Sequence, residues 1–329
     1  MYKLIIIGST SNICKIRAFK NISELDIFDK VYCYGWEQWS NNDFKSYLLN
    51  EVNGDTSNLI NNIEFINGDY NDYNIKISYL IDDNTIIYVS TPPLCYDKIL
   101  SFCKEIDYNF KIIFEKPFSS SYNDFIKLKE KVTNKVNILD HFLYKLDIMD
   151  VIQEFKNKEI KYIKIKFNYS DNVEDRLGYF DKVGFFKDMF QSHYLSIVYS
   201  LIGNNITNLK NSVIKKNIRK QYKSYGGKNK VDTYFYVELF DKRCTYIFEA
   251  GKSINDCKEI TINNNTFKIN NYENEYTLYF KSIIENTNLN FINQQELFWE
   301  IYDIIKNDFE ANYKLQYYNY VTLTTDNKK

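Results

Sequence analysis

The chain has 329 residues, a formal net charge of −1, six cysteines and two histidines. At ~100–200 residues per domain, this length predicts two domains. Hydrophobic residues at 44% and aromatic residues at 17% supply a buried core, which excludes a disordered protein. Charges of both signs balance, which argues against a nucleic-acid or membrane-surface binder. The apolar runs have strand length, so we expect no membrane-spanning helix, and the N-terminus shows no signal-peptide pattern.

The cysteines give no sign of a metal or disulfide framework. They form no C-x-x-C pair and no spacing typical of Cys/His metal ligands. A chain of this length needs no disulfides to hold its core, so we expect reduced thiols, a cytoplasmic protein and no metal site.

The N-terminal part alternates short apolar runs with segments of helical periodicity. Helices are expected at Asn12–Ile22, Tyr96–Glu105 and Ser121–Val132. Strands are expected at Lys3–Ile7, Val31–Tyr34, Ile63–Ile66, Thr85–Ser90, Lys111–Phe114 and Lys135–Leu139. Apolar strands separated by helices indicate a doubly wound parallel sheet covered on both faces. The pattern therefore predicts a Rossmann-like dinucleotide-binding domain over residues 1–140.

Beyond Lys145 the pattern changes to alternating runs such as Ile160–Tyr169, which are typical of antiparallel strands with one wet face. Further strands are expected at Thr233–Leu239, Cys244–Glu249, Glu259–Ile262 and Thr266–Ile269. Helices are expected at Leu146–Phe155, Gly184–Leu201, Tyr276–Asn286 and Gln294–Phe309, and an exposed basic loop at Asn211–Lys230. We therefore expect a second, substrate-binding α+β domain over residues 141–329, with a mainly antiparallel sheet.

A small polar loop follows the first strand and consists of Gly8, Ser9, Thr10, Ser11 and Asn12. A dinucleotide fold uses glycine here so that the backbone can approach a pyrophosphate. One glycine is a weak signal, and an ordinary strand-to-helix turn explains it as well.

The second strand is followed closely by Glu37. In a dinucleotide fold an acidic residue here binds the ribose 2′-hydroxyl, whereas an arginine accepts a 2′-phosphate. Because no arginine lies nearby, Glu37 favours NAD over NADP. A plain surface role for Glu37 fits the sequence nearly as well.

Two proline-containing loops follow buried strands. One contains Pro92 and Pro93, and the other contains Glu115, Lys116 and Pro117. Open α/β sheets bind their ligands at the carboxyl ends of strands, and a following proline keeps Lys116 in an extended turn. A lysine in one turn is usually only solvated, but two such loops at one sheet edge indicate a site.

Each histidine has a carboxylate nearby in the sequence. Asp140 precedes His141 after a predicted strand, and Asp188 precedes His193 by five residues on the expected long helix. A single histidine is usually structural. A histidine oriented by a carboxylate, however, can act as a general base near neutral pH.

Taken together, these motifs resemble the glucose-6-phosphate dehydrogenase family. Gly8–Lys15 resembles its nucleotide loop G-A-S-G-D-L-A-K, and Ile86–Pro93 resembles L-F-Y-L-A-L-P-P. Ile112–Phe118 is similar to I-I-V-E-K-P-F, and Ile138–Lys145 to R-I-D-H-Y-L-G-K. Glu174–His193 follows E-G-R-G-G-Y-F-D-x-x-G-I-I-R-D-V-M-Q-N-H, and Gly251–Asn255 resembles part of C-G-K-A-L-N. The matches keep one order along residues 4–258.

The resemblance implies a dehydrogenase of carbohydrate metabolism and the pentose phosphate pathway. It would oxidise C1 of glucose 6-phosphate, or of a close hexose 6-phosphate, to the lactone with NAD or NADP, with a preference for NAD. His193 would abstract the proton of the C1 hydroxyl, and Asp140 would orient His193. Lys116 would lie between the sugar and the nicotinamide.

The resemblance also implies a set of binding residues. His141, Lys145 and Lys252 would bind the 6-phosphate. Glu174 and Asp188 would accept sugar hydroxyls, and Arg17 matches a basic position near the substrate. The cofactor would be bound by Gly8, Ser9, Thr10, Ser11, Asn12, Glu37, Pro92 and Lys116.

The chain also departs from the family pattern. Ser11 replaces the second loop glycine, Asn12 replaces an aspartate, and Glu37 stands where an arginine selects NADP. Tyr144 replaces the glycine before Lys145. The resemblance also implies a shortened member, with deletions between His193 and Tyr234 and in the C-terminal sheet, where family members pack subunits together. The oligomeric state therefore stays open, with a homodimer as one candidate.

Two alternatives remain. A sugar oxidoreductase of the Gfo/Idh/MocA type shares a Rossmann domain, a Glu-Lys-Pro turn and an Asp-x4-His helix, but Asp140, His141 and Lys145 favour a phosphosugar. A catalytically silent binding or regulatory relative would explain the altered glycine loop. The retained Asp140, Lys116 and His193 argue against that second alternative. We expect a hexose 6-phosphate as the ligand, and neither nucleic acid nor a membrane as a partner.

Overall fold

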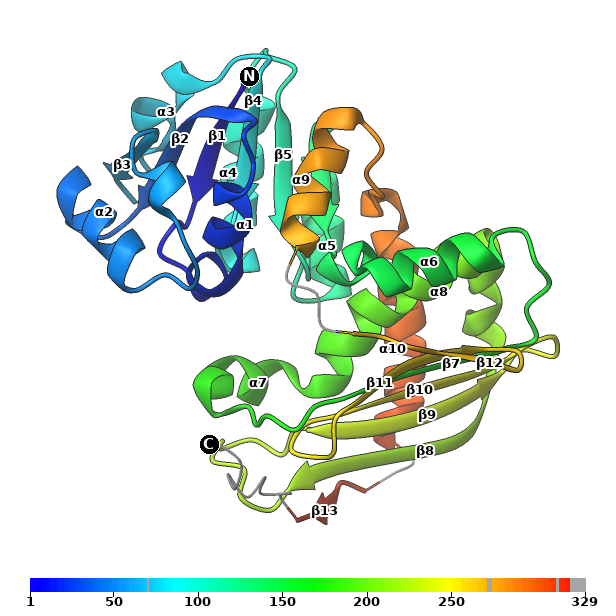
Figure 1. Cartoon of the computed structure of the whole chain (residues 1–329). Coiled ribbons are helices and arrows are strands. Elements are labelled where there is room, and N and C mark those ends of the chain that lie inside the picture. The colour runs from blue at the N-terminus through cyan, green and yellow to red at the C-terminus, as the bar shows by residue number, and fades with distance from the viewer. Residues whose placement is uncertain (70, 271–273, 312–313, 320–329) are drawn as a thin grey trace. The chain divides into compact units, whose positions relative to one another are not determined.

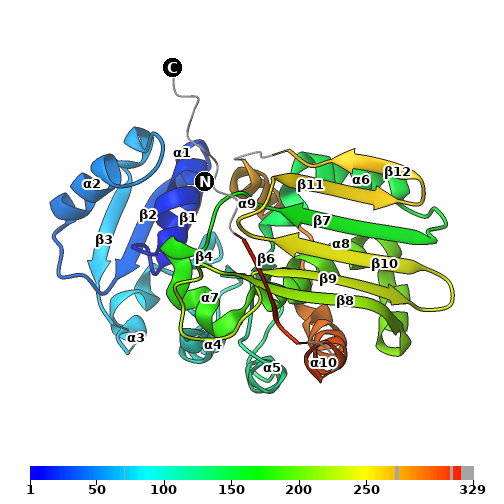
Figure 2. The same ribbon diagram turned by 90° about the horizontal axis from the view of Figure 1, so that it is seen from below.

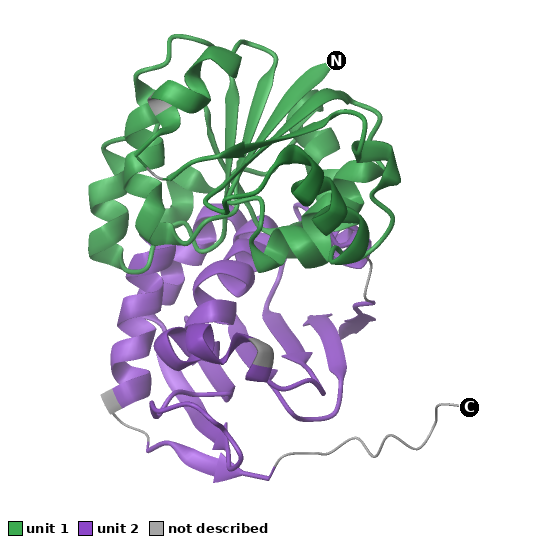
Figure 3. Ribbon diagram, turned by 90° about the vertical axis from the view of Figure 1, so that its left-hand side faces the viewer, with its two compact units in different colours: residues 1–144, 272–296 green, residues 145–271, 297–329 purple. Residues whose placement is uncertain are grey.

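The structure, a computed structural model, describes residues 1–69, 71–270, 274–311 and 314–319. The chain forms two compact units (Figure 3). Unit 1 comprises Met1–Tyr144 and Tyr272–Glu296, and unit 2 comprises Lys145–Asn271 and Leu297–Lys329. Among the described residues, every helix is too short or too polar to cross a membrane.

Unit 1 is built on a six-stranded sheet whose strands are all parallel. In chain order the strands are β1 (Tyr2–Ile7), β2 (Phe28–Gly35), β3 (Ile63–Asn67), β4 (Thr85–Val89), β5 (Lys111–Glu115) and β6 (Val136–Leu139). Their spatial order is β3-β2-β1-β4-β5-β6, so the winding reverses between β1 and β4. The predicted doubly wound sheet is confirmed. Sheets of this kind bind ligands outside the carboxyl ends of the strands at the reversal.

Helices cover both faces of this sheet, which explains the apolar runs within its strands. Strand β4, for example, is buried along its whole length. One face is covered by α1 (Phe19–Ser23), α2 (Asn41–Asn50) and α9 (Glu275–Glu285), and the other by α3 (Tyr73–Lys76), α4 (Tyr96–Lys104) and α5 (Tyr122–Lys129) (Figure 2). Short helical segments are η1 (Cys14–Ala18), η2 (Ser57–Leu59), η3 (Ser78–Leu80), η4 (Pro93–Cys95), η5 (His141–Tyr144) and η9 (Ile292–Gln294).

Helix α9 groups with unit 1, although residues 141–329 were expected to form the second domain. Phe280 of α9 packs edge-on against Tyr88 of β4 at 5.8 Å between ring centroids. The Tyr276 hydroxyl donates a hydrogen bond to Glu115 of β5. The crossover helices α4 and α5 lie on the opposite face, so this face of β4 and β5 needs cover from elsewhere. Residues 141–144 also group with unit 1, so the compact units divide the chain differently from the expected boundary.

Unit 2 contains a seven-stranded sheet in the order β12-β11-β7-β10-β9-β8-β13 (Figure 2). Its strands are β7 (Tyr162–Asn168), β8 (Val213–Tyr222), β9 (Tyr234–Phe240), β10 (Thr245–Gly251), β11 (Cys257–Ile262), β12 (Asn265–Lys268) and β13 (Gln316–Tyr318). The β7–β10 and β8–β13 pairs are parallel and the others are antiparallel. The prediction of a mainly antiparallel sheet is therefore confirmed.

The sequence-based prediction of a loop over residues 211–230 is wrong, because residues 213–222 form strand β8. The strand is rich in lysine and only Asn217, Gln221 and Tyr222 are buried in it, so it has no apolar alternation to reveal it. Antiparallel pairing with β9 forms it instead, from Val213 opposite Phe240 to Lys220 opposite Tyr234.

Three helices of unit 2 lie over one face of this sheet, namely α6 (Leu146–Phe155), α8 (Leu195–Ile202) and α10 (Gln295–Ala311) (Figure 1). The other helical segments are η6 (Glu174–Arg176), α7 (Leu177–Val183), η7 (Lys187–Tyr194) and η8 (Gly203–Asn211). The Phe186 ring stacks on Phe309 of α10 at 4.4 Å and lies 5.0 Å from Phe235 of β9. The helix expected over residues 184–201 is π-helical in η7 and continues as α8.

Candidate active site

The loop after β1 requires glycine at Gly8. Gly8 has a φ of +84°, a conformation that side chains other than hydrogen adopt with strain. A Cβ atom there would lie 2.7 Å from the Thr91 Cγ2 and 2.9 Å from the Ser90 carbonyl oxygen. The backbone after β1 therefore passes directly beside the backbone after β4, at the reversal of the sheet.

Two serines hold this loop in place. Ser9 is fully buried, and its backbone N–H and its hydroxyl both donate to the Tyr34 carbonyl, at 3.1 and 3.3 Å. The Ser11 hydroxyl lies 2.5 Å from the Ser90 hydroxyl and accepts a hydrogen bond from the Cys14 N–H at 3.3 Å. The serine that replaces a family glycine thus links the loop after β1 to the end of β4.

The turn after β2 presents an aromatic ring and a carboxylate. Trp36 is 71% exposed, and Asn67 holds the turn by donating to the carbonyls of Trp36 and Glu37 at 3.2 and 2.5 Å. The carboxylate of Glu37 folds back over Gly35, where a Cβ atom would lie 2.7 Å from Oε2. Within the described part of the chain, Oε2 is buried and accepts no hydrogen bond. This oxygen could therefore still accept a hydrogen bond.

The turn after β5 contains Glu115 and Lys116, and the Lys116–Pro117 peptide bond is cis. The Oε1 atom of Glu115 accepts hydrogen bonds from the hydroxyls of Tyr88 at 2.6 Å and Tyr276 at 2.8 Å. Burial raises the pKa of Glu115 to about 7, against the lowering effects of both hydrogen bonds and of the positive charges of Lys116 and Arg17. Arg17, predicted near the substrate, therefore lies in the electrostatic neighbourhood of Glu115.

Asp140 and His141 stand where β6 ends. Asp140 is 5% exposed, and its Oδ1 accepts a hydrogen bond from the Phe142 N–H at 3.0 Å, which stabilises the turn η5. The His141 ring stacks on Tyr276 with 6.2 Å between centroids and 20° between planes. Tyr144, which replaces a family glycine, is buried, and its hydroxyl accepts a hydrogen bond from the Leu289 N–H at 3.0 Å.

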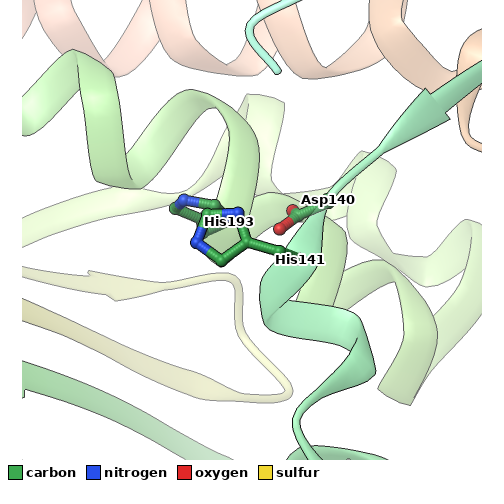
Figure 4. Close-up of side chains that lie close together, drawn as sticks. All are labelled: Asp140, His141 and His193. Atoms are coloured by element: carbon green, nitrogen blue, oxygen red, sulfur yellow. The ribbon is translucent and has the colours of Figure 1, made fainter. Parts of the chain in front are cut away.

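In unit 2 the helical turn η7 carries Asp188 and His193. They are 7% and 1% exposed. The Tyr179 hydroxyl of α7 donates to the Asp188 Oδ1 at 2.8 Å and so fixes that carboxylate. Figure 4 shows the His193 ring on its helix, and Asp140 and His141 at the end of their strand. A π-helical turn is rare and often marks a functional site, because its extra residue re-aims the side chains of the helix.

A second cluster of charges lies where β7 and β10 end. The Lys252 ammonium pairs with Asp171 at 2.7 Å and lies 4.2 Å from the centroid of the Tyr169 ring. Burial lowers the pKa of Lys252, while the carboxylates of Asp171 and Asp188 raise it and the positive charge of Arg176 lowers it. Lys252, Asp188 and Arg176 therefore share one electrostatic neighbourhood.

The remaining predicted residues occupy turns. Lys145 is 8% exposed, and its carbonyl accepts the first hydrogen bonds of α6. Glu174 opens the short turn η6. Pro92 is exposed before η4, and Thr10 and Asn12 lie on the loop after β1.

Sequence reasoning missed four residues of these clusters, namely Trp36, Tyr276, Tyr179 and Asp171. Tyr276 lies 161 residues from its partner Glu115, and Asp171 lies 81 residues from Lys252, so no local pattern could pair them. Trp36 alone had a local signal, because an aromatic residue next to Glu37 at the end of a strand is unusual for a solvent-exposed turn.

Known proteins resemble this chain in sequence and in fold. The model of the glucose-6-phosphate dehydrogenase NAD binding domain matches residues 16–149, and that of the glucose-6-phosphate dehydrogenase C-terminal domain matches residues 151–240. A glucose-6-phosphate 1-dehydrogenase of Encephalitozoon cuniculi is 28% identical over 202 residues, which cover 58% of this chain and 45% of that protein. The chain spans about half the length of the curated relatives that it matches.

The fold comparison agrees. The structure of a glucose-6-phosphate dehydrogenase in complex with its substrate glucose-6-phosphate has a TM-score of 0.78 at 15% identity, covering 99% of this chain and 95% of that one. A myo-inositol dehydrogenase of Corynebacterium glutamicum has a TM-score of 0.70 at 11% identity, covering 94% of this chain and 97% of that one.

The fold is that of dehydrogenases that combine a parallel dinucleotide-type sheet with a mixed sheet. The two consecutive domain matches define the chain more narrowly. It belongs to the glucose-6-phosphate dehydrogenase family.

Proposed function

We propose that the chain oxidises C1 of glucose 6-phosphate, or of a close hexose 6-phosphate, to the lactone. The observation that carries this proposal is the π-helical turn η7, which holds Asp188 and His193 buried and in the register of the family motif. The Tyr179 hydroxyl on Asp188 supports it, because a carboxylate fixed in one orientation can select sugar hydroxyls by their geometry.

In this proposal His193 is the general base. An imidazole nitrogen takes the proton of the C1 hydroxyl, and Asp140 orients the ring and stabilises the imidazolium that forms. The nicotinamide, when bound, supplies the acceptor for the hydride that leaves C1. Lys116 lies between the sugar and the cofactor, and Arg17 contributes positive charge near the substrate.

The other charged residues bind the substrate. His141, Lys145 and Lys252 hold the 6-phosphate by charge-assisted hydrogen bonds, whereas Asp188 and Glu174 accept hydrogen bonds from sugar hydroxyls. A site that holds both ends of the sugar places C1 for proton and hydride transfer.

Two features of unit 1 fit a nicotinamide dinucleotide. Gly8 has no side chain where the backbone after β1 would approach a pyrophosphate, and in this proposal Ser9, Thr10, Ser11, Asn12 and Pro92 also contribute to cofactor binding. The carboxylate of Glu37 would accept a hydrogen bond from a ribose 2′-hydroxyl and would repel a 2′-phosphate. We therefore propose NAD as the preferred cofactor.

The test is turnover by the purified chain. NAD or NADP is combined with glucose 6-phosphate, other hexose 6-phosphates and the free hexoses, and formation of reduced cofactor is followed by its absorbance. We expect turnover with hexose 6-phosphates and faster turnover with NAD. Turnover of free sugars only would remove the phosphate-binding roles of His141, Lys145 and Lys252, and no turnover with any pair would refute the enzymatic proposal.

A catalytically silent relative is the second candidate, and one contact favours it. The hydroxyl of Ser11 is tied to Ser90 on the loop that would bind the pyrophosphate. Quenching of the fluorescence of the exposed Trp36 by NAD measures cofactor binding independently of turnover. Binding without turnover would favour this candidate over the dehydrogenase.

A further inference from the structure

The Lys252 ammonium already has an anionic partner within the protein, the carboxylate of Asp171. The Lys252 side chain is 12% exposed, and its ammonium donates to the Asp171 Oδ2 at 2.7 Å. The Tyr169 ring lies beneath the ammonium at 4.2 Å, and the Phe185 ring lies at 5.9 Å. A largely buried ammonium on aromatic rings is short of water and needs an anion. Asp171 supplies that anion.

The backbone fixes this pairing. The Ser253 N–H donates to the Asp171 carbonyl at 2.9 Å, and the Ile254 N–H donates to the Tyr169 carbonyl at 3.1 Å. The Lys252 carbonyl accepts a hydrogen bond from the Tyr318 hydroxyl at 2.6 Å. The two segments that carry Lys252 and Asp171 therefore lie side by side independently of the ion pair. The Asp171 side chain itself is 67% exposed, so rotation into water costs it little burial.

We propose that Asp171 is a specificity-determining residue that competes with the phosphate of the substrate for Lys252. This inference rests on the proposed function, because it takes Lys252 as a ligand of the 6-phosphate. A phosphate on the Lys252 ammonium would lie close to the Asp171 carboxylate, and the two anions repel each other, so the phosphate competes with Asp171 for Lys252. Asp171 therefore weakens binding of phosphorylated sugars and of inorganic phosphate by the same factor, and leaves free sugars unaffected.

The experiment compares Asp171→Asn with the matched control Asp256→Asn. Asp256 is also exposed, at 54%, and pairs more loosely with Lys258 at 3.8 Å, next to the same Tyr169 ring. In Asp171→Asn we expect the KM for glucose 6-phosphate and the inhibition constant of inorganic phosphate to fall about three- to tenfold, with kcat unchanged. Asp256→Asn should change neither constant. An unchanged or raised KM in Asp171→Asn would overturn the proposal.

A double-mutant cycle shows whether Asp171 acts through Lys252. In the Lys252→Met background, Asp171→Asn should lose most of its effect on the KM. An equal effect in both backgrounds would mean that Asp171 repels the substrate directly, and the proposed competition would be wrong.

Calorimetric titration with inorganic phosphate separates this inference from the proposed function. If the wild type turns over no hexose phosphate, the proposed function fails. Asp171→Asn should still bind phosphate more tightly than the wild type, and equal binding, or none in either protein, would refute the competition. Equal melting temperatures of the variants confirm that all of them are folded.

Discussion

The two sheets present polar side chains in different ways. In unit 1, β4 and β6 are buried along their whole lengths, and the charged residues Lys116, Asp140 and His141 follow the ends of β5 and β6. In unit 2, burial alternates along β9, and one face of the sheet is covered by helices that carry the buried polar residues Asp188 and His193. In a parallel sheet covered on both faces, a site therefore forms at the carboxyl ends of the strands. In a sheet covered on one face, the packed helices supply the side chains of the site.

The two units also hold their charges differently. Glu115 in unit 1 is held by two tyrosine hydroxyls, one of which comes from the returning helix α9. Lys252 in unit 2 is held by the exposed side chain of Asp171. Changes around Glu115 should therefore affect the folding of unit 1, whereas changes around Lys252 should affect substrate binding under the proposed function.

The sharpest test of this difference is His193→Asn on η7. We expect kcat to fall by about a thousandfold, because the general base is lost, while the affinity for NAD measured by Trp36 fluorescence stays unchanged. Ser200→Ala on the adjoining α8 is the control and should keep full activity. A loss confined to the KM would show that His193 is not the base and that η7 only binds substrate.

Glu115→Gln tests whether burial raises the pKa of Glu115 in the folded protein. The folded-state pKa of about 7 lies above the ordinary value of 4.5, so the folded protein retains a proton that the unfolded chain has released. Relative to the Gln variant, the wild type should therefore lose about 2–3 kcal/mol of unfolding free energy as the pH rises from 4.5 to about 8, with the loss levelling off above that pH. Urea unfolding across this range measures the difference. Parallel pH profiles of the two proteins would contradict it, and Glu64→Gln on the exposed side of β3 is the control.

Gly8→Ala tests the close approach of the two loops in unit 1. The methyl group would meet Thr91 and the Ser90 carbonyl in a backbone conformation that disfavours alanine, so we expect a loss of about 2 kcal/mol of unfolding free energy and weaker NAD binding. In α7, a Cβ atom at Gly178 would meet no atom within 4 Å. Gly178→Ala should therefore be neutral or slightly stabilising. Equal stability of the two variants would show that the loop adapts freely.

The smallest expected effect concerns the choice of cofactor. Glu37→Ala removes the carboxylate that would repel a 2′-phosphate, so the ratio of NAD to NADP affinity should fall about tenfold. Titration of Trp36 fluorescence with each cofactor measures this ratio. If the wild type already binds NADP more tightly, Glu37 is a surface residue and the assignment fails.

The sequence was most informative where the signal is local. Apolar runs separated by helical patterns located the six strands of unit 1, and Gly8 after the first run marked the loop at the reversal of the sheet. The family motif from Glu174 to His193 was visible because its residues are close together in the chain. Strand β8 was missed because a lysine-rich strand near a sheet edge shows no alternation of apolar residues.

The sequence by itself thus determined the class of fold, the order of the two sheets and the family, because periodicity and motifs are properties of neighbouring residues. Only the tertiary structure assigned α9 to unit 1, joined Tyr276 to Glu115 and set Asp171 against Lys252. Those contacts join segments far apart in the chain. They exist because a buried sheet face must be covered and a buried charge must find a partner, wherever in the chain that cover and that partner come from.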